Sequence, residues 1–294
     1  MTDHTSPTST VTLAGRPVHR IGFGAMQLPG PGVFGPPRDR DAALAVLRRA
    51  VELGVDHIDT AQYYGPDVSN ELIRSALFPY PENLVFVSKV GGDRDDRGGW
   101  IPACKPEQLR AGVEANLRSL EIERVDAVNL RLMDEHIEPG SEFDVPFADQ
   151  LGEMIALRDE GKIGAIGLST VGVDTLREAL ETTEIACVQN PYNLRQRGDQ
   201  AVLDLCIERG IPYVPYFPLG SAGMPGFVKV TDDPAVKSVA ARLGATPSQV
   251  GLAWVLAQGP NVLLIPGTSS VAHLEENLGA GEIVLDDDAL TELG

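Results

Sequence analysis

One pattern recurs through most of the chain: a short apolar run rich in valine and isoleucine, a loop, and then a stretch with apolar residues every three or four positions. Such runs predict buried strands, and the three- and four-residue spacing predicts amphipathic helices. Strands that alternate with helices favour a parallel sheet with crossover helices. Strands are predicted over residues 21–26, 55–59, 84–89, 126–132, 165–169, 186–190, 211–217 and 262–266, and helices over 41–54, 106–121, 173–183 and 199–210.

Eight such strands suit the (β/α)₈ barrel, which closes at about 250 residues. A doubly wound sheet is the alternative, but no G-x-G-x-x-G motif opens a helix after an early strand. Two short apolar runs around Gly15 predict a hairpin. We therefore expect an α/β fold, a (β/α)₈ TIM barrel with a short N-terminal β-hairpin cap. Residues 1–10 are expected to be a disordered tail, and residues 11–294 a single domain.

The charge balance narrows the range of partners. Asp and Glu number 42 against 24 Lys and Arg, a net charge of −18, which disfavours nucleic acids and anionic membranes. The chain has no apolar run of transmembrane length, and its first ten residues lack the features of a secretory signal. Three cysteines without a CxxC motif predict a reduced, cytoplasmic protein without a metal site. We expect a small-molecule partner and favour a monomer, although the sequence leaves the oligomeric state open.

Three charged residues close predicted strands. Period-two alternation places Asp59, Lys89 and Arg131 on inward faces, so they converge at the barrel mouth. Buried charges are costly unless they pair or bind something, and a purely structural Asp–Lys ion pair is the alternative. Tyr64 lies five positions beyond Asp59. Its ordinary pKa near 10 is too high for an acid at neutral pH unless a cation stabilises the phenolate, and Lys89 is placed to do so. These residues therefore predict a general acid–base site.

Several motifs occur in a characteristic order: G-F-G-A-M at 22–26, H-I-D-T-A-x-x-Y-G at 57–65, V-S-K at 87–89, G-L-S at 167–169 and I-P-G-T-S-S-x-x-H-L-x-E-N at 265–277. From about residue 12 onward, the chain resembles the aldo-keto reductase superfamily. The resemblance implies an NADP-dependent oxidoreductase. Tyr64 would protonate the carbonyl oxygen, and Asp59 and Lys89 would lower its pKa. The catalytic residues are then Asp59, Tyr64, Lys89 and Arg131.

Other segments, including PGPGVFGPPRDR and YVPYFPLG, are especially similar to the bacterial pyridoxal reductase subgroup. That similarity implies reduction of pyridoxal to pyridoxine with NADPH. Three alternatives remain open. The substrate could be another aldehyde or ketone metabolite, Lys89 could form a Schiff base as in barrel aldolases, or the protein could be a slow cofactor-binding sensor or regulatory protein.

The resemblance also implies a site for NADPH or NADP⁺. Ser169 and Gln189 match positions that hold the nicotinamide carboxamide, and Tyr216 matches the aromatic residue under the nicotinamide ring. The residues from Leu219 to Ser221 match the loop along the pyrophosphate. The full implied set is Gly24, Ala25, Met26, Asp59, Ser169, Thr170, Gln189, Tyr216, Leu219, Gly220, Ser221, Gly267, Thr268, Ser269, Ser270, His273, Glu276 and Asn277.

The sequence departs from the superfamily pattern at three places. Arg131 stands where histidine is usual, and we interpret it as a residue that orients the substrate by contacting the phenolic oxygen of pyridoxal. Thr170 replaces a common asparagine. The lysine and arginine that often bind the 2′-phosphate are missing, yet hydroxyls and a helix start still favour NADPH over NADH. Tyr63, Trp100 and Arg131 are the expected substrate residues.

Overall fold

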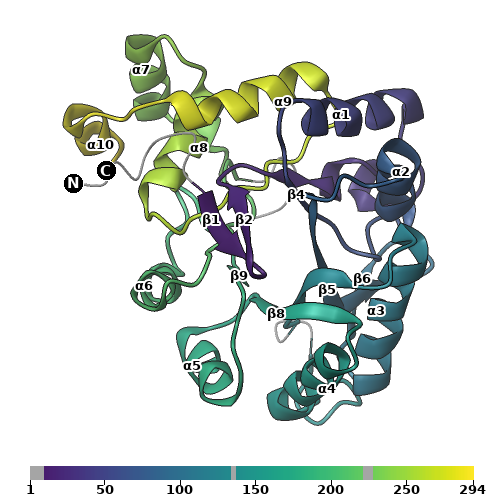
Figure 1. Cartoon of the computed structure of the whole chain (residues 1–294). Coiled ribbons are helices and arrows are strands. Elements are labelled where there is room, and N and C mark those ends of the chain that lie inside the picture. The colour runs from purple at the N-terminus through teal and green to yellow at the C-terminus, as the bar shows by residue number, and fades with distance from the viewer. Residues whose placement is uncertain (1–9, 134–136, 221–227) are drawn as a thin grey trace.

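The computed structural model describes residues 10–133, 137–220 and 228–294, so most of the predicted tail lies outside the described residues. The chain opens with an antiparallel hairpin of β1 (Thr10–Leu13) and β2 (Arg16–His19), and Thr10 is already part of it (Figure 1). Ala14 and Gly15 form the turn with φ values of 50° and 76°. Two residues with positive φ make the tight turn that suits the twist of paired strands.

The main sheet is parallel and curls into a barrel. Its order is β3 (Phe23–Gly24), β4 (His57–Asp59), β5 (Val85–Arg94), β7 (Val125–Arg131), β8 (Ile163–Ser169) and β9 (Val188–Gln189). Single-residue parallel bridges then join Val188 to Tyr213, Tyr213 to Val262, and Leu264 back to Ile21. The two predicted strands at 211–217 and 262–266 thus close the barrel through these bridges. The predicted (β/α)₈ barrel with an N-terminal hairpin is confirmed.

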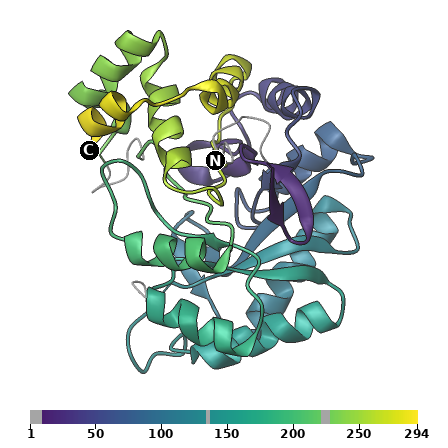
Figure 2. The ribbon, with the colours of Figure 1, turned by 60° about the vertical axis from the view of Figure 1, so that its left-hand side comes forward.

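Helices surround the strands on the outside (Figure 2). Their starts and ends follow local signals: Asp39 accepts a hydrogen bond from the Ala42 amide at the start of α1, and Gly210 ends α6 with φ of 66°. The helices are α1 (Arg40–Glu52), α2 (Val68–Leu77), α3 (Pro106–Leu120), α4 (Phe147–Asp159), α5 (Val173–Thr182), α6 (Gln200–Arg209), α7 (Pro234–Leu243), α8 (Pro247–Ala257), α9 (Val271–Leu278) and α10 (Asp287–Leu293), with 3-10 helices η1 (Ala25–Gln27), η2 (Pro31–Val33), η4 (Val230–Asp232) and η5 (Gly279–Glu282).

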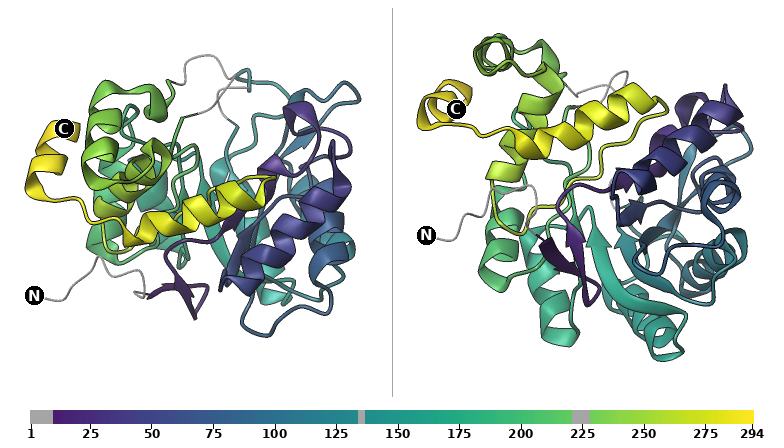
Figure 3. Two further views of the ribbon diagram at one scale, coloured as in Figure 1. Left: turned by 90° about the horizontal axis from the view of Figure 1, so that it is seen from above. Right: turned by 45° about the horizontal axis from the view of Figure 1, so that its top comes forward.

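The apolar core has two layers. Outward-facing strand residues such as Phe86 and Val128 pack against the helices. Inward-facing residues such as Val85 and Val87 fill the barrel together with Leu13 and Val18 of the hairpin. The hairpin therefore closes the end of the barrel where the strands begin, at the lower edge of the left view in Figure 3.

The structure differs from several predicted elements: β4 and β9 are shorter than predicted, and segments 211–217 and 262–266 pair only through isolated bridges. Strand β3 is only two residues long, because η1 begins at Ala25. Strand β5 continues to Arg94 and pairs antiparallel with β6 (Trp100–Ala103), so a hairpin occupies part of the predicted loop after the third strand. This β5–β6 hairpin places Trp100 opposite Arg94.

Several polar, aromatic and sulfur-containing residues outside the predicted site lie in the interior. Trp254 is buried in α8 and stacks on Tyr192, and all three cysteines are free and buried. His57 is buried inside the barrel, with Nδ1 3.3 Å from Asp56, whereas its Nε2 has no hydrogen-bond partner in the described part of the chain. None of the described helices is long and apolar enough to cross a membrane.

Candidate active site

A cavity of about 500 Å³ opens where the barrel strands end. Asp59 ends β4, Arg131 ends β7, and Lys89 comes from β5, so the three predicted charged residues converge there. The predicted residues that line the cavity are Gly24, Met26, Asp59, Tyr64, Lys89, Trp100, Arg131, Tyr216, Leu219, Gly220, Gly267, Thr268, His273, Glu276 and Asn277.

Lys89 and Asp59 form a buried ion pair at the base of this cavity, each about 3% exposed. The Lys89 ammonium donates to Asp59 Oδ1 and, at 3.2 Å, to the carbonyl of Thr60. The other carboxylate oxygen, Asp59 Oδ2, accepts a 2.7 Å hydrogen bond from Gln189 Nε2. Both oxygens of the carboxylate are therefore held, and so is the direction of the Lys89 side chain.

Tyr64 lies directly beside this pair, with Lys89 Nζ 5.1 Å from the centre of its ring. Burial raises the pKa of the Tyr64 phenol, the Asp59 charge raises it further, and the Arg131 charge acts in the opposite direction. The sequence predicted that Asp59 and Lys89 together lower this pKa, whereas the net shift in the structure is upward and Asp59 contributes to it. The reason is that Tyr64 is only 3% exposed and the charge of Lys89 is neutralised by Asp59. The phenol is therefore held in its protonated form.

Arg131 lines the same cavity, and its guanidinium carbon lies 5.7 Å from the centre of the Tyr216 ring. The hydroxyl of Tyr216 lies 3.3 Å from Thr170 Oγ1. The Arg131 guanidinium therefore lies beside the ring and hydroxyl of Tyr216. This arrangement suits a flat molecule that carries a polar oxygen.

Some predicted site residues do not line the cavity. Tyr63 is fully buried and packs edge-on against Tyr64 and Trp100, at ring distances of 5.4 and 5.6 Å, so it supports the wall from behind. Ser270 caps α9 by accepting from the His273 amide. Gln189 contacts Asp59, as described above. Ala25, Ser169, Thr170 and Ser269 also lie off the lining, and Ser221 lies outside the described residues.

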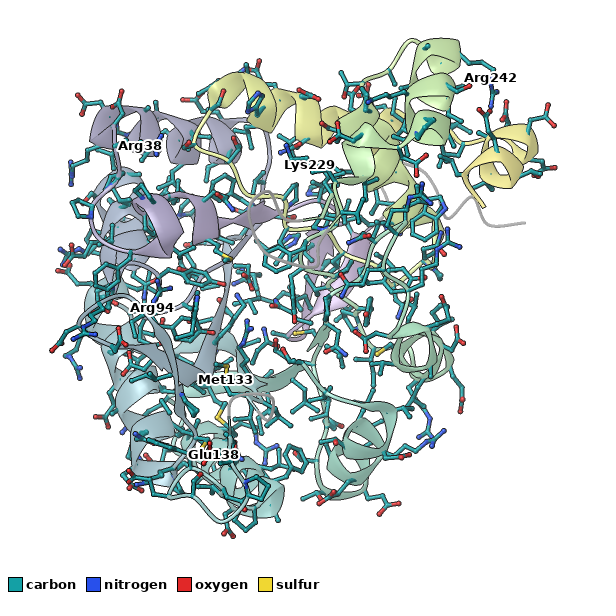
Figure 4. The ribbon with its side chains drawn as sticks, turned by 180° about the vertical axis from the view of Figure 1, so that it is seen from behind. Arg38, Arg94, Met133, Glu138, Lys229 and Arg242 are labelled. Carbon is teal, nitrogen blue, oxygen red and sulfur yellow. The ribbon has the colours of Figure 1, made fainter. Side chains whose placement is uncertain are left out.

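The cavity also has residues that sequence reasoning missed. Most are neighbours of predicted ones in the chain, and reading each loop in full would have included them. Ser248 comes from the first turn of α8 and carries no local signal. The additional residues are Gln27, Met133, Phe217, Pro218, Ser248, Ile265 and Pro266; Met133 is labelled in Figure 4.

Two glycines bring the first and last loops of the cavity into backbone contact. A side chain at Gly24 would lie 2.4 Å from the carbonyl oxygen of Ile265, and one at Gly267 would lie 2.6 Å from the carbonyl oxygen of Gly24. The last of these loops continues to the start of α9. There, Thr268 Oγ1 accepts a hydrogen bond from the Ser270 amide. Glu276 is fixed there by the Thr246 hydroxyl at 2.6 Å.

The fold and the cavity define a barrel enzyme, since barrels of this type carry their active sites where the strands end. The Aldo/keto reductase family model matches residues 20–293, and the chain belongs to this family of oxidoreductases. The resemblance predicted from its motifs is confirmed.

Known proteins match nearly the whole chain. It is 47% identical to the pyridoxine 4-dehydrogenase of Escherichia coli (strain K12), over 97% of each protein. A crystal structure of a thermostable aldo-keto reductase with the inhibitor epalrestat is 29% identical, with a TM-score of 0.79 over 97% of this chain and 98% of that one. An aldo/keto reductase from Klebsiella pneumoniae, in complex with NADP and acetate, is 27% identical, with a TM-score of 0.77 over 97% and 94%.

Proposed function

We propose that this protein reduces an aldehyde to an alcohol with NADPH, and that pyridoxal, reduced to pyridoxine, is its preferred substrate. The observation that carries the proposal is the buried Tyr64 beside the Asp59–Lys89 ion pair, in a cavity that Arg131 also lines. The 47% identical E. coli relative is a pyridoxine 4-dehydrogenase, which supports the choice of substrate.

The residues present fit a nicotinamide cofactor. Gln189 Oε1 is buried and lacks a hydrogen-bond partner among the described residues, so it offers an acceptor for a carboxamide. Tyr216 offers a ring face to stack on, and Thr268, His273 and Asn277 line the end of the cavity near α9, where an anion is favoured. The bound nicotinamide supplies the hydride. Two crystal structures of aldo-keto reductase from K. pneumoniae are complexes with NADP or NADPH, which supports the same cofactor here.

Tyr64 is the proposed general acid. Its phenol keeps the proton that the carbonyl oxygen needs, because burial opposes ionisation. Once the proton leaves, the charge of Arg131 favours the phenolate. Asp59 keeps Lys89 in place through their ion pair.

Arg131 is the proposed substrate-orienting residue. Arginine is permanently charged, so it cannot replace a histidine as a neutral donor, but its planar fork can hold a phenolic oxygen. Pyridoxal carries such an oxygen beside its aldehyde. Arg131 would therefore turn the aldehyde toward Tyr64 and stabilise the charge that develops near it.

Particular residues of the site bear on two alternative functions, a Schiff-base enzyme and a cofactor-binding sensor. A Schiff-base role for Lys89 needs an amine that is free to attack a carbonyl carbon, whereas Lys89 Nζ is engaged by Asp59 Oδ1 and the Thr60 carbonyl, which argues against it. A slow cofactor-binding sensor is favoured by Arg131 in place of histidine. Tight NADPH binding without turnover of any aldehyde would support the sensor.

The test is NADPH oxidation at 340 nm with pyridoxal, pyridoxal phosphate and benzaldehyde. Tyr64→Phe is expected to lower kcat at least about 100-fold with every substrate. Arg131→Leu is expected to lower kcat/KM about 10- to 100-fold for pyridoxal and far less for benzaldehyde.

Full activity of Tyr64→Phe would refute the role of Tyr64 as general acid, and unchanged pyridoxal reduction by Arg131→Leu would refute the orienting role of Arg131. Activity with benzaldehyde alone would keep the reductase and exclude the vitamin. NADH in place of NADPH tests the cofactor preference.

A further inference from the structure

Arg94 is a buried cation at the edge of the candidate active site. It ends β5, is 8% exposed, and is labelled in Figure 4. Its guanidinium carbon lies 4.0 Å from the centre of the Trp100 ring and 5.6 Å from that of Phe34. The Nη2 atom donates a 2.6 Å hydrogen bond to the carbonyl of Gly32. Arg94 therefore covers one side of Trp100, a residue that lines the cavity.

This arrangement costs free energy. The Nε and Nη1 atoms of Arg94 are buried and find no hydrogen-bond partner within the described residues. Burial lowers the pKa of the Arg94 guanidinium, and the nearby charge of Asp95 only partly opposes this. A cation held against the face of an indole is stabilised by the electron-rich ring, and this contact replaces part of the lost hydration. The side chain is thus held by stacking rather than by a carboxylate.

Arg94 also joins two separate segments around Trp100. Gly32 and Phe34 belong to the loop that contains η2, whereas Arg94 and Trp100 belong to the β5–β6 hairpin. The Phe34 ring packs on Gly98 so closely that a side chain there would approach it to 2.9 Å.

The same loop continues to the proposed acid. Phe34 forms a bridge with Gly65, which directly follows Tyr64 in the chain. Trp100 in turn packs against Tyr63 in a T-shaped arrangement, with ring centres 5.6 Å apart. The position of Trp100 is therefore coupled to the wall that carries Tyr64.

We propose that Arg94 is a positioning residue that selects the shape of the substrate. It holds the Trp100 ring as a flat wall of the cavity, so that the site prefers flat aromatic aldehydes to puckered rings of the same size. This inference rests on the proposed aldehyde reduction, and it assigns the selectivity to a residue that does not itself line the cavity.

The test compares benzaldehyde with cyclohexanecarbaldehyde, two neutral aldehydes with the same number of carbons but different ring shapes. Arg94→Met removes the guanidinium plane, and Arg97→Met, at an exposed position in the same hairpin turn, is the matched control. Arg94→Met is expected to raise KM for benzaldehyde about 3- to 10-fold, with less than a twofold change for cyclohexanecarbaldehyde and in either kcat. Arg97→Met is expected to match wild type. Equal changes in KM for both aldehydes, or no change, would overturn the proposal.

A second measurement does not depend on turnover. The chain has two tryptophans, so subtracting the fluorescence of Trp100→Phe isolates the emission of Trp100. Acrylamide is expected to quench the fluorescence of Trp100 at least twofold more strongly in Arg94→Met than in wild type. Equal quenching would refute the proposal that Arg94 holds the Trp100 ring. If wild type reduces neither these two aldehydes nor pyridoxal, the proposed function fails, whereas the quenching result still decides whether Arg94 holds Trp100. Should Arg94→Met not fold, Arg94→Lys takes its place, because an ammonium cannot stack as a plane.

Discussion

Gln189 donates a hydrogen bond to Asp59 although 130 positions separate them in the chain. Asp59 ends β4 and Gln189 ends β9, so the bond crosses the barrel interior between non-adjacent strands. The carboxylate that holds Lys89 is thereby fixed from both sides. Its orientation depends on the closure of the whole barrel and not on one loop.

The buried Asp59–Lys89 pair predicts that removing one charge lowers the free energy of unfolding more than removing both. Lys89→Met leaves the Asp59 charge buried without its cation and is expected to lower the free energy of unfolding by about 3–5 kcal/mol. Asp59→Asn combined with Lys89→Met removes both charges and is expected to lose less than Lys89→Met alone. Urea denaturation of wild type, Lys89→Met, Asp59→Asn and the double variant measures these losses of stability. A double variant whose loss equals the sum of the single losses would contradict the coupling.

The raised pKa of Tyr64 predicts a specific dependence on pH. The unfolded phenol ionises near its ordinary pKa of 10.0, while the buried phenol keeps its proton. The contribution of Tyr64 to stability is therefore complete below pH 10 and is lost as the pH rises beyond it. Tyr64→Phe is expected to lose stability less steeply than wild type between pH 10 and pH 11.

Spectroscopy provides the control for this prediction. Phenolate absorbance at 295 nm is expected to be the same in wild type and Tyr64→Phe from pH 8 to pH 10. A phenolate signal in that range that disappears with the substitution would show a lowered pKa instead.

The cysteines are expected to be unreactive in the folded protein. All three are buried, and burial raises the pKa of both Cys187 and Cys206 to about 12. The thiolate is the reactive form, and it is scarce at pH 8. Ellman's reagent should therefore label no thiol within minutes in the native protein and three after unfolding in guanidinium. Rapid labelling of one native thiol would identify a reactive cysteine.

Arg20 predicts a large structural loss far from the cavity. Its buried guanidinium donates to the carbonyls of Val262, Leu256 and Gly259 at 3.1, 2.6 and 2.6 Å. Arg20→Met leaves these carbonyls without this donor and is expected to lower the free energy of unfolding by about 3 kcal/mol.

The matched control is Arg242→Met, at a surface position labelled in Figure 4 where arginine pairs with Asp286. It should change stability by less than about 1 kcal/mol. Equal losses in the two variants, measured by thermal or urea unfolding, would refute the role of burial at Arg20.

Alternation along the strands was enough to predict the centre of the site. Because side chains on a strand point alternately in and out, the inward direction of Val85 and Val87 also sets that of Lys89. The same reasoning brought Asp59 and Arg131 to the cavity from two other strands. The barrel itself followed from the repeated strand–helix pattern, which constrains topology more than it constrains the length of any strand.

Other features depend on contacts that no local pattern encodes. The β5–β6 hairpin forms within a segment rich in Asp, Arg and Gly that reads as a loop. Tyr63 lies behind the wall and not on it, because packing against Tyr64 and Trp100 decides its position. The direction of the pKa shift of Tyr64 depends on burial and on how Lys89 and Asp59 neutralise each other, and both require the folded structure.

The single-residue bridges that close the barrel have a consequence for its internal motion. We call the two segments between β9 and β3, residues 211–217 and 262–266, the seam of the barrel. Among the described residues, backbone hydrogen bonds join these two segments only from the Leu263 amide to Tyr213 and, just before the second segment, from the Tyr213 amide to Asn261, whereas β5, β7 and β8 pair over longer stretches. Local opening needs fewer bonds to break at the seam, so those amides are expected to exchange with deuterium before the amides of β7. Tyr216 belongs to the first segment of the seam, so the Tyr216 side of the cavity borders the seam, whereas Lys89 lies in the part of β5 that pairs with β7 over four residues.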